Sequence, residues 1–361
     1  MTKLIEPRIA AAVARRFAGD RGHQGSYLVD RLTRDLDVCV PRAEQLVGEA
    51  SGIPAPAPVR WAVIDRGTWA ETNIRSMSDL LSPIADKVAH QMASTPLPMR
   101  LMQQALVSTE VGVLLGYVSR RVLGQYDVLV PEVEAESRPR RRRRGGTNGA
   151  ALLFVGTNMV ETEQRFGFIP EEFTLWVAVH EVTHRFQFEG VPWLRPRFLG
   201  LVHEYLASVE LGPKTLTARL KTATRRLMSR SVPAEEKNPA YLFSTDEQRE
   251  LLDQIQALMA VVEGHGNYVM DAVGAEVIPS FKRMRHVFER RRQQQRLVQR
   301  VISQVLGLEM KMRQYELGQM FCEAVVEREG EGALTRLWED ESQLPTMSEL
   351  RDPQLWLRRV A

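Results

Sequence analysis

The chain has 361 residues, of which 44% are hydrophobic and 26% are charged, and its formal net charge is +3. This balance is typical of a globular protein and excludes a disordered or fibrous chain, while the small net charge indicates no particular partner. The length allows one large domain or two domains of ordinary size.

The two cysteines, Cys39 and Cys322, lie far apart in segments of helical character. They form neither a disulfide framework nor a C-x-x-C metal motif, which favours a reducing, cytoplasmic location. The N-terminal alanine-rich run is interrupted by Arg15 and Arg16, whereas a signal peptide needs a longer apolar region. The most apolar stretch, 105–124, contains a glutamate and two arginines, so we interpret it as a buried helix and expect no membrane contact.

The first part of the chain, 1–131, is predicted to be an N-terminal helical region, in which proline-rich breaks at 54–58 and 95–98 separate amphipathic runs. Three glycines in it share helical spacing: Gly112, Gly116 and Gly124. In a span interrupted by charge, such spacing favours close packing of helices over a membrane dimer face. We therefore expect a bundle-like arrangement.

Two β-like runs follow, YDVLVP at 126–131 and ALLFVGTN at 151–158. We expect them to pair as a hairpin. Between them, 132–149 is acidic at first and then strongly basic, which predicts a flexible charged loop. The run from Arg140 to Arg144 has no interleaved aromatic residues, so we favour a solvated loop over a contact with nucleic acid.

From 150 to 361 the signals are again mostly helical, and this region is expected to carry the chemistry of the chain. Pro170 and the two glutamates after it suit the first turn of a helix that ends near Gly190. Further helices are predicted at 197–211, 214–230, 246–273, 279–300, 304–329 and 331–340. The predicted fold class is mainly α, with a small β-hairpin or short sheet next to the helix that begins at Pro170.

That helix contains the stretch WVAVHEVTHRFQFEG (176–190), in which His180, Glu181 and His184 form an H-E-x-x-H pattern. On a helix the two histidines lie one turn apart on one face, where both imidazoles can reach a single Zn²⁺ ion. The carboxylate of Glu181 can take a proton from a water at the metal and pass it to a leaving amine. Zinc itself lowers the pKa of that water and polarises a substrate carbonyl.

These residues could instead be ordinary core histidines with an incidental glutamate. With 7 histidines and 45 acidic residues in the chain, about 0.02 matches to H-[DE]-x-x-H are expected by chance. The surrounding helix is apolar nearly all round, and burying two imidazoles and a carboxylate is unfavourable unless they are paired or bind a metal. A zinc site is therefore the favoured interpretation.

A catalytic zinc site normally has three protein ligands and one open position, so a third ligand must come from farther along the chain. We prefer Glu263, because Glu263, Asn267 and Asp271 recur at four-residue intervals and form a polar stripe on an apolar helix. Asn267 or Asp271 would accept the N–H of a ligand histidine. Two alternatives stay open: Glu263 could be a buried salt-bridge partner, and Glu204 could be the third ligand, a support for the ligands or a structural residue.

The neighbours of Glu263 are informative as well. Gly264 and Gly266 weaken the helix, and such glycines often let another backbone approach closely. His265 lies about 200° round the helix from Glu263, so we do not expect it to share the direction of Glu263. It can still donate a hydrogen bond to a reacting oxyanion, which makes it a candidate catalytic residue.

Three blocks of the sequence resemble a known family: HEVTHRFQFEGVPWLRP, VVEGHGNYVMDAVGAEVIP and LGLEMKMRQYELGQMF. They are similar to blocks of the actinobacterial zincin-like metallopeptidase family, whose members are associated with deazaflavin-cofactor biosynthesis. The resemblance spans nearly the whole chain and implies a mostly helical zincin-like fold, zinc as cofactor and a downstream glutamate as ligand. Asn267 departs from the family, where an acidic residue is more common, and no residue of the chain implies the association with cofactor biosynthesis.

The third block adds candidate residues for substrate binding. Lys311 and Arg313 can bind a substrate carboxylate, and Tyr315 can donate a hydrogen bond to a tetrahedral oxyanion. Each of the three could equally be an ordinary surface or core residue.

Taken together, these features predict a zinc-dependent hydrolase of peptide or amide bonds, with the strand at 151–155 aligning an extended substrate by edge pairing. The alternative is a non-catalytic scaffold or binding protein stabilised by zinc, in which His265 or His203 closes the coordination. We expect a peptide or amide substrate and no membrane or nucleic-acid partner. The oligomeric state and the substrate do not follow from the sequence.

Overall fold

The structure is a computed structural model in which most residues belong to helices or short strands. The described residues are 5–19, 26–57, 60–82, 84–85, 87, 96–129, 151–209, 244–290 and 309–361. For 309–315, only the helical backbone is described. The predictions that concern the loop 132–149, with Arg140 to Arg144, and the helix at 214–230 lie outside the described residues.

Contacts divide the chain into two compact units. The first consists of Met1–Gly190 and Val269–Phe281, and the second consists of Val191–Tyr268 and Lys282–Ala361. The boundaries predicted around 132–149 fall in a stretch that is not described, so that division of the chain stays a prediction.

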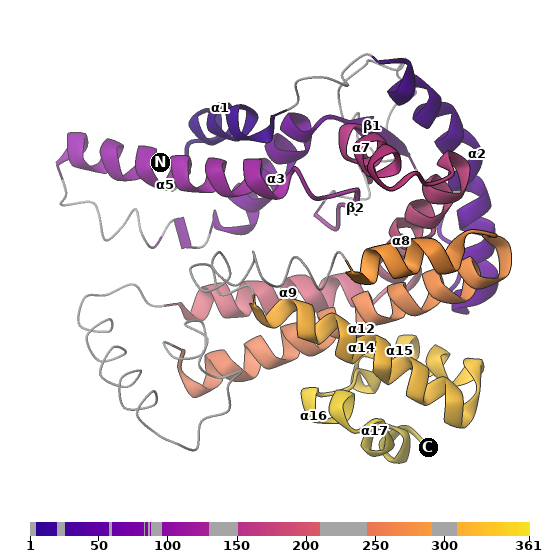
Figure 1. Ribbon diagram of the computed structural model, residues 1–361. Coiled ribbons are helices and arrows are strands. Elements are labelled where there is room, and N and C mark those ends of the chain that lie inside the picture. Colours follow the sequence, from indigo (N-terminus) through magenta and orange to yellow (C-terminus); the bar gives the residue numbers. More distant parts are fainter. Residues whose placement is uncertain are drawn as a thin grey trace. The chain divides into compact units, whose positions relative to one another are not determined.

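Helices make up most of the first unit, which confirms the mainly α fold class. They are α1 (Pro7–Ala18), α2 (Tyr27–Ser51), α3 (Arg66–Leu80), α5 (Leu97–Val118), α7 (Gly156–Phe166) and α8 (Pro170–Gly190). Figure 1 shows α1 lying along α5 and α2 lying along α8. The contact between α2 and α8 covers one side of the helix that carries the H-E-x-x-H pattern.

Two glycines explain the close contact of α1 with α5. A Cβ atom at Gly112 would lie 2.5 Å from the carbonyl oxygen of Ala10, and one at Gly116 would lie 2.7 Å from that of Ala14. The two backbones therefore meet where only glycine fits, which confirms the helix packing predicted for this pair.

The prediction of a buried helix at 105–124 was wrong, because only one side of α5 is buried. The helix has 22 residues and α1 has 12, so α1 can cover only part of its length. Large apolar side chains in its first half are exposed: Leu97, Met99, Leu101, Met102 and Leu106. By length and composition α5 could also cross a membrane, with 22% of the tested window buried, so the absence of membrane contact stays a prediction.

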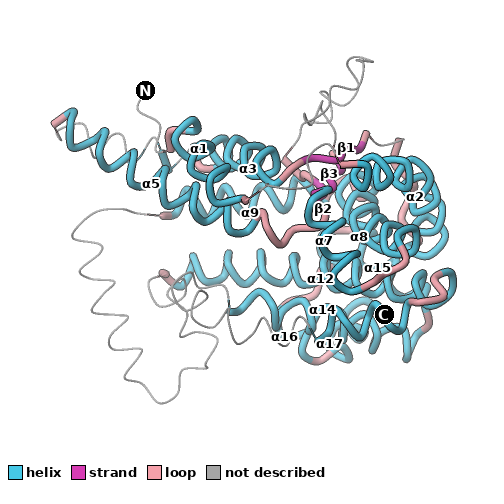
Figure 2. Tube along the Cα trace, turned by 45° about the horizontal axis from the view of Figure 1, so that its top comes forward, coloured by secondary structure: helices cyan, strands magenta, loops and turns pink. Residues whose placement is uncertain are grey.

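The sheet has three short strands, β1 (Trp61–Ile64), β2 (Gly124–Tyr126) and β3 (Leu152–Val155), in the order β1-β3-β2. Strand β3 pairs in parallel with β1 and antiparallel with β2. Figure 2 shows the three strands side by side in magenta. All four residues of β3 are fully buried, since the strand is flanked on both edges.

The predicted pairing of the two β-like runs is confirmed, but the first strand is 124–126 rather than 126–131. The strand ends early because Asp127 starts a turn, in which its carboxylate accepts a hydrogen bond from the Leu129 backbone N–H at 3.1 Å. The proposal that the strand at 151–155 pairs with a substrate was wrong, because β3 is the central strand and both its edges are occupied. The edge strands are β1 and β2.

Helix α8 is buried along most of its length, as its apolar sequence predicted. Arg185, at 1% exposure, donates from Nη1 to Glu44 of α2 at 2.5 Å and from Nε to Glu189 of α8 at 2.9 Å. At the start of the helix, Glu172 accepts a hydrogen bond from the backbone N–H of Ser280 at 2.9 Å. Both ends of α8 are thus fixed by hydrogen bonds to carboxylates within the first unit.

The second unit is also largely helical. Its helices include α9 (Leu194–Ser208), the first part of α12 (Asp246–Val277), α14 (Glu309–Glu329), α15 (Arg336–Glu339), α16 (Met347–Arg351) and α17 (Pro353–Val360), and residues 282–290 are helical as well. A short 3₁₀ helix, η2 (Glu331–Thr335), precedes α15, and another, η3 (Glu341–Gln343), follows it. The predicted helices at 197–211, 246–273 and 304–329 correspond to α9, α12 and α14, and the predicted bounds at 210–211 and 304–308 lie outside the described residues. Cys322 of α14 and Cys39 of α2 are free and buried, so neither forms a disulfide.

The crossing of α12 and α14 is unusually close. A Cβ atom at Gly264 would lie 2.1 Å from the carbonyl carbon of Gly318, and one at Gly318 would lie 1.8 Å from the carbonyl oxygen of Ala260. The close backbone approach predicted at Gly264 is therefore confirmed, and Gly318 is its partner. The crossing fixes α12 one residue after Glu263.

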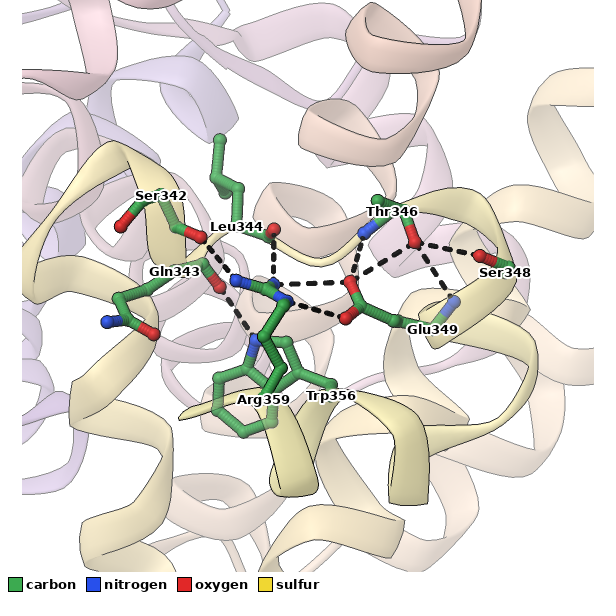
Figure 3. Close-up of polar contacts among 8 residues, drawn as sticks. All are labelled: Ser342, Gln343, Leu344, Thr346, Ser348, Glu349, Trp356 and Arg359. Carbon is green, nitrogen blue, oxygen red and sulfur yellow. Dashed lines mark hydrogen bonds and ion pairs between the residues drawn. The ribbon is translucent and has the colours of Figure 1, made fainter. Parts of the chain in front are cut away.

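Arg359 of α17 is hydrogen-bonded to residues of the preceding segment, 342–349 (Figure 3). Its guanidinium donates to both carboxylate oxygens of Glu349 and to the carbonyls of Ser342 and Leu344. Thr346 and Glu349 form a capping box at the start of α16. Burial raises the pKa of Glu349, but the hydrogen bonds and charge of Arg359 together with the Thr346 bonds outweigh it and hold that pKa below its ordinary value.

Candidate metal centre

The two histidines of α8 face each other across one helical turn. Their Nε2 atoms lie 3.2 Å apart, and their rings are nearly perpendicular at 80° with centroids 4.6 Å apart. Two imidazoles that share a tetrahedral zinc ion at about 2.05 Å each place their nitrogens about 3.3 Å apart. The spacing of His180 and His184 therefore fits the zinc ion that the sequence predicted.

Gln187 orients the second histidine. The Oε1 atom of Gln187 lies 2.9 Å from Nδ1 of His184, and Gln187 is fully buried. An amide oxygen can only accept, so Nδ1 of His184 carries the proton and its Nε2 lone pair is left for a metal. Sequence reasoning assigned such support to Asn267 or Asp271 and missed Gln187, although its place three residues after His184, on the same helix face, could have indicated it.

A third candidate ligand joins the pair. His180, His184 and Glu263 each offer one ligand atom, and these atoms all lie within 4.8 Å of one another. Glu263 is half-buried on α12. The competing residue, Glu204, is exposed on α9 and is not part of this group. The donor set of two imidazoles and one carboxylate is the one that catalytic zinc commonly has.

Glu181 lies beside this group and packs against β2. Its side chain is 7% exposed. A Cβ atom built at Gly124 of β2 would lie 2.7 Å from Cγ and 2.8 Å from Oε1 of Glu181. Gly124 was expected to pack between helices because of its spacing from Gly116, and that expectation was wrong: α5 ends at Val118, and Gly124 is a strand residue.

Strand β2 is attached to α8 by a second residue on the same face. The ring of Tyr126 stacks on Phe188 at 5.9 Å between centroids and 13° between planes. Its hydroxyl donates to Glu189 Oε1 at 3.2 Å. Sequence reasoning missed Tyr126, because its partners follow it by about 60 residues and no local pattern connects them.

The other predicted residues have varied surroundings. His265 is 1% exposed and packs edge-on against Trp338, with ring centroids 4.9 Å apart and an interplanar angle of 75°. Asn267 is buried and Asp271 is half-buried, both on α12. The backbone of α14 carries Lys311, Arg313 and Tyr315, whose side chains lie outside the described residues. The catalytic and substrate-binding roles of these residues stay predictions.

A pair of histidines one turn apart and a neighbouring carboxylate on a helix, next to a small sheet, are features of zinc-dependent metallopeptidases. The model of the zincin-like metallopeptidase family matches residues 5–357, and the chain belongs to that family. The chain is also similar to a solved structure from Chloroflexus aurantiacus, a "putative hydrolase with a novel fold", at 30% identity, 98% coverage of each chain and a TM-score of 0.69.

These comparisons confirm the resemblance at the level of the zincin-like family and indicate a protein of the hydrolase kind. A comparison with curated proteins finds no match. The narrower parts of the resemblance, an actinobacterial subfamily and an association with deazaflavin-cofactor biosynthesis, stay predictions.

Proposed function

We propose that the protein is a zinc-dependent hydrolase of peptide or amide bonds, in which His180, His184 and Glu263 bind the metal. The observation that carries the proposal is the 3.2 Å distance between the two histidine Nε2 atoms, with Nδ1 of His184 oriented by Gln187. In the absence of a shared cation or proton, two imidazole nitrogens gain little from facing each other inside a largely apolar helix environment. Membership of the zincin-like metallopeptidase family supports the same conclusion.

When bound, zinc would supply a Lewis acid that polarises a substrate carbonyl and makes water a stronger nucleophile near neutral pH. Glu181 is the proposed general base. Its carboxylate accepts a proton from the attacking water and then donates it to the nitrogen of the leaving group. The burial of Glu181 favours this role, because electrostatic interactions are stronger where water is scarce.

The outer edge of β2, which pairs with no other strand among the described residues, supports an extended substrate. The backbone carbonyl of Leu123 accepts a hydrogen bond from the N–H of Val155, and the backbone N–H of Asp127 donates to the carbonyl of Ala151. In an antiparallel pair the residues that bond to the partner strand alternate with residues that do not, so the N–H and C=O of Gly124 point away from β3. A substrate strand would pair with β2 at Gly124, next to the Glu181 carboxylate. This arrangement replaces the edge pairing that the sequence assigned to 151–155.

Zinc content tests the proposed ligands. We expect stoichiometric zinc in the wild-type protein, and loss of zinc in His180→Ala, His184→Ala and Glu263→Ala. Glu204→Ala is the matched control, since it removes an exposed glutamate outside the group and should keep its zinc. Full zinc in both histidine variants would refute the metal site, whereas zinc loss in Glu204→Ala but not in Glu263→Ala would reassign the third ligand.

Activity against a peptide library tests the catalytic step. Glu181→Gln should keep zinc and lose activity by about 10²- to 10⁴-fold, the usual contribution of a general base. A wild-type protein that binds zinc but cleaves no peptide or amide in the library would instead favour the non-catalytic scaffold.

A further inference from the structure

Gly124 is the residue of β2 that faces Glu181. Side chains alternate along a strand, so Gly124 and Tyr126 face α8, whereas Gln125 points the other way, to Asn73 of α3. The three atoms nearest to a Cβ at position 124 all belong to Glu181, at 2.7, 2.8 and 2.9 Å. Any side chain at this position would overlap the carboxylate.

The backbone conformation does not require glycine here. The described glycines with a positive φ are Gly19, Gly52, Gly167 and Gly330, and Gly124 is not among them. An alanine could therefore adopt the same backbone angles. What the position requires is space, and the space is taken by the carboxylate of Glu181.

Strand β2 cannot easily move aside to make room for a side chain. Gln125 and Asn73 exchange two amide hydrogen bonds at 3.2 and 3.3 Å, which fix one face of the strand. On the other face, Tyr126 stacks on Phe188 and donates to Glu189. The ladder to β3 holds the inner edge. The carboxylate is the one flexible group in the contact, so an added Cβ would displace Glu181 and not the strand.

We infer that Gly124 is a positioning residue for the general base: because it has no side chain, the Glu181 carboxylate can occupy the space on the α8-facing side of β2. The inference rests on the proposed function, because it assigns Gly124 an effect that is transmitted through Glu181. The Gly124→Ala variant should accordingly keep the metal ligands and lose the alignment of the base.

A double-mutant cycle in thermal stability tests the contact without any substrate. Gly124→Ala should lower the melting temperature in the wild-type background and have a much smaller effect in a Glu181→Ala background, where the overlapping atoms are absent. If Gly124→Ala does not fold, recovery of folding in Gly124→Ala/Glu181→Ala supports the contact. Equal destabilisation in both backgrounds, or failure of both variants to fold, would overturn it.

Zinc content and kinetics test the positioning role. Gly124→Ala should retain wild-type zinc, keep its KM within about threefold and lose kcat by about 10²-fold or more, as for the loss of a general base. It should cause no further loss when Glu181→Gln is already present. Gly200→Ala is the matched control, because a Cβ at Gly200 on α9 meets nothing within 4 Å. Wild-type kcat in Gly124→Ala would overturn the inference and leave the proposed function intact, whereas a wild-type protein without zinc or activity would refute the proposed function itself.

Discussion

The crossing of α12 and α14 gives the sharpest stability prediction, because two backbones meet there without any side chain between them. In Gly318→Ala the new Cβ would lie 1.8 Å from the carbonyl oxygen of Ala260 and 2.6 Å from its carbon. Both are backbone atoms inside a helix, so no rotamer change can relieve the overlap. The helices themselves must move apart.

The size of the effect follows from these distances. Ordinary contact begins near 3.4 Å, so the backbones must separate by about 1.6 Å at the crossing. Overpacking of this kind costs about 3 kcal/mol, and the better helix propensity of alanine returns about 1 kcal/mol. We therefore expect Gly318→Ala to lower the free energy of unfolding by about 2 kcal/mol.

Urea unfolding followed by circular dichroism measures this change, and zinc titration measures its consequence for the candidate metal centre. Glu263 precedes Gly264, the partner of Gly318 in the crossing, so separating the helices should also weaken zinc binding. The control is Gly200→Ala, which has open space for its Cβ and should stabilise the protein by about 0.5–1 kcal/mol. A Gly318→Ala protein as stable as the wild type would refute the close crossing.

Three further predictions concern hydrogen bonds and buried carboxylates. Gln187→Leu removes the acceptor for Nδ1 of His184 and should weaken zinc binding by about 10- to 100-fold in a competition titration, while Gln187→Glu should retain it. Burial raises the pKa of Asp35, so Asp35→Asn should be more stable than the wild type at neutral pH, and calorimetry should show the gain vanish as the pH falls below 3.8, where the carboxyl becomes protonated in both states. The pKa of Glu349 is lowered in the folded protein, so its ionised carboxylate stabilises the fold fully above pH 4.5, and this stabilisation is lost as the pH falls through the folded-state pKa. Glu349→Gln should therefore be less stable than the wild type at neutral pH and equally stable in strong acid.

The local parts of the candidate site could be predicted from the sequence. A four-residue spacing puts His180 and His184 on one helix face whatever the tertiary structure is, and the apolar residues around them require burial. The polar stripe on α12 indicated Glu263 for the same reason, since side chains four residues apart share a face. The stripe could not show which of its members belongs to the same group as the histidines, because the four-residue spacing is local and says nothing about residues distant in the chain.

The strands were harder to predict, and Gly124 shows why. Its spacing from Gly112 and Gly116 is compatible with a helix, but α5 ends at Val118, six residues before Gly124. Nothing near position 124 in the sequence indicates that the side chain of Glu181 occupies the adjacent space. A three-residue strand is too short for a period of two to be recognised, so pairing with β3 decides the structure instead of local preference.

Arg185 helps to fix the position of the helix that carries the candidate metal ligands. It follows His184 directly, is almost fully buried, and bonds Glu44 of α2 and Glu189 of α8. Glu189 in turn accepts from Tyr126 of β2, so one guanidinium connects the helix packed on one side of α8 with the strand on the other. A buried cation between two carboxylates adds little net stability, because desolvation offsets most of the attraction. Its geometric effect is larger: sliding α8 past α2 or β2 would leave a buried charge without its partner, and this holds His180, His184 and Glu181 in register with β2.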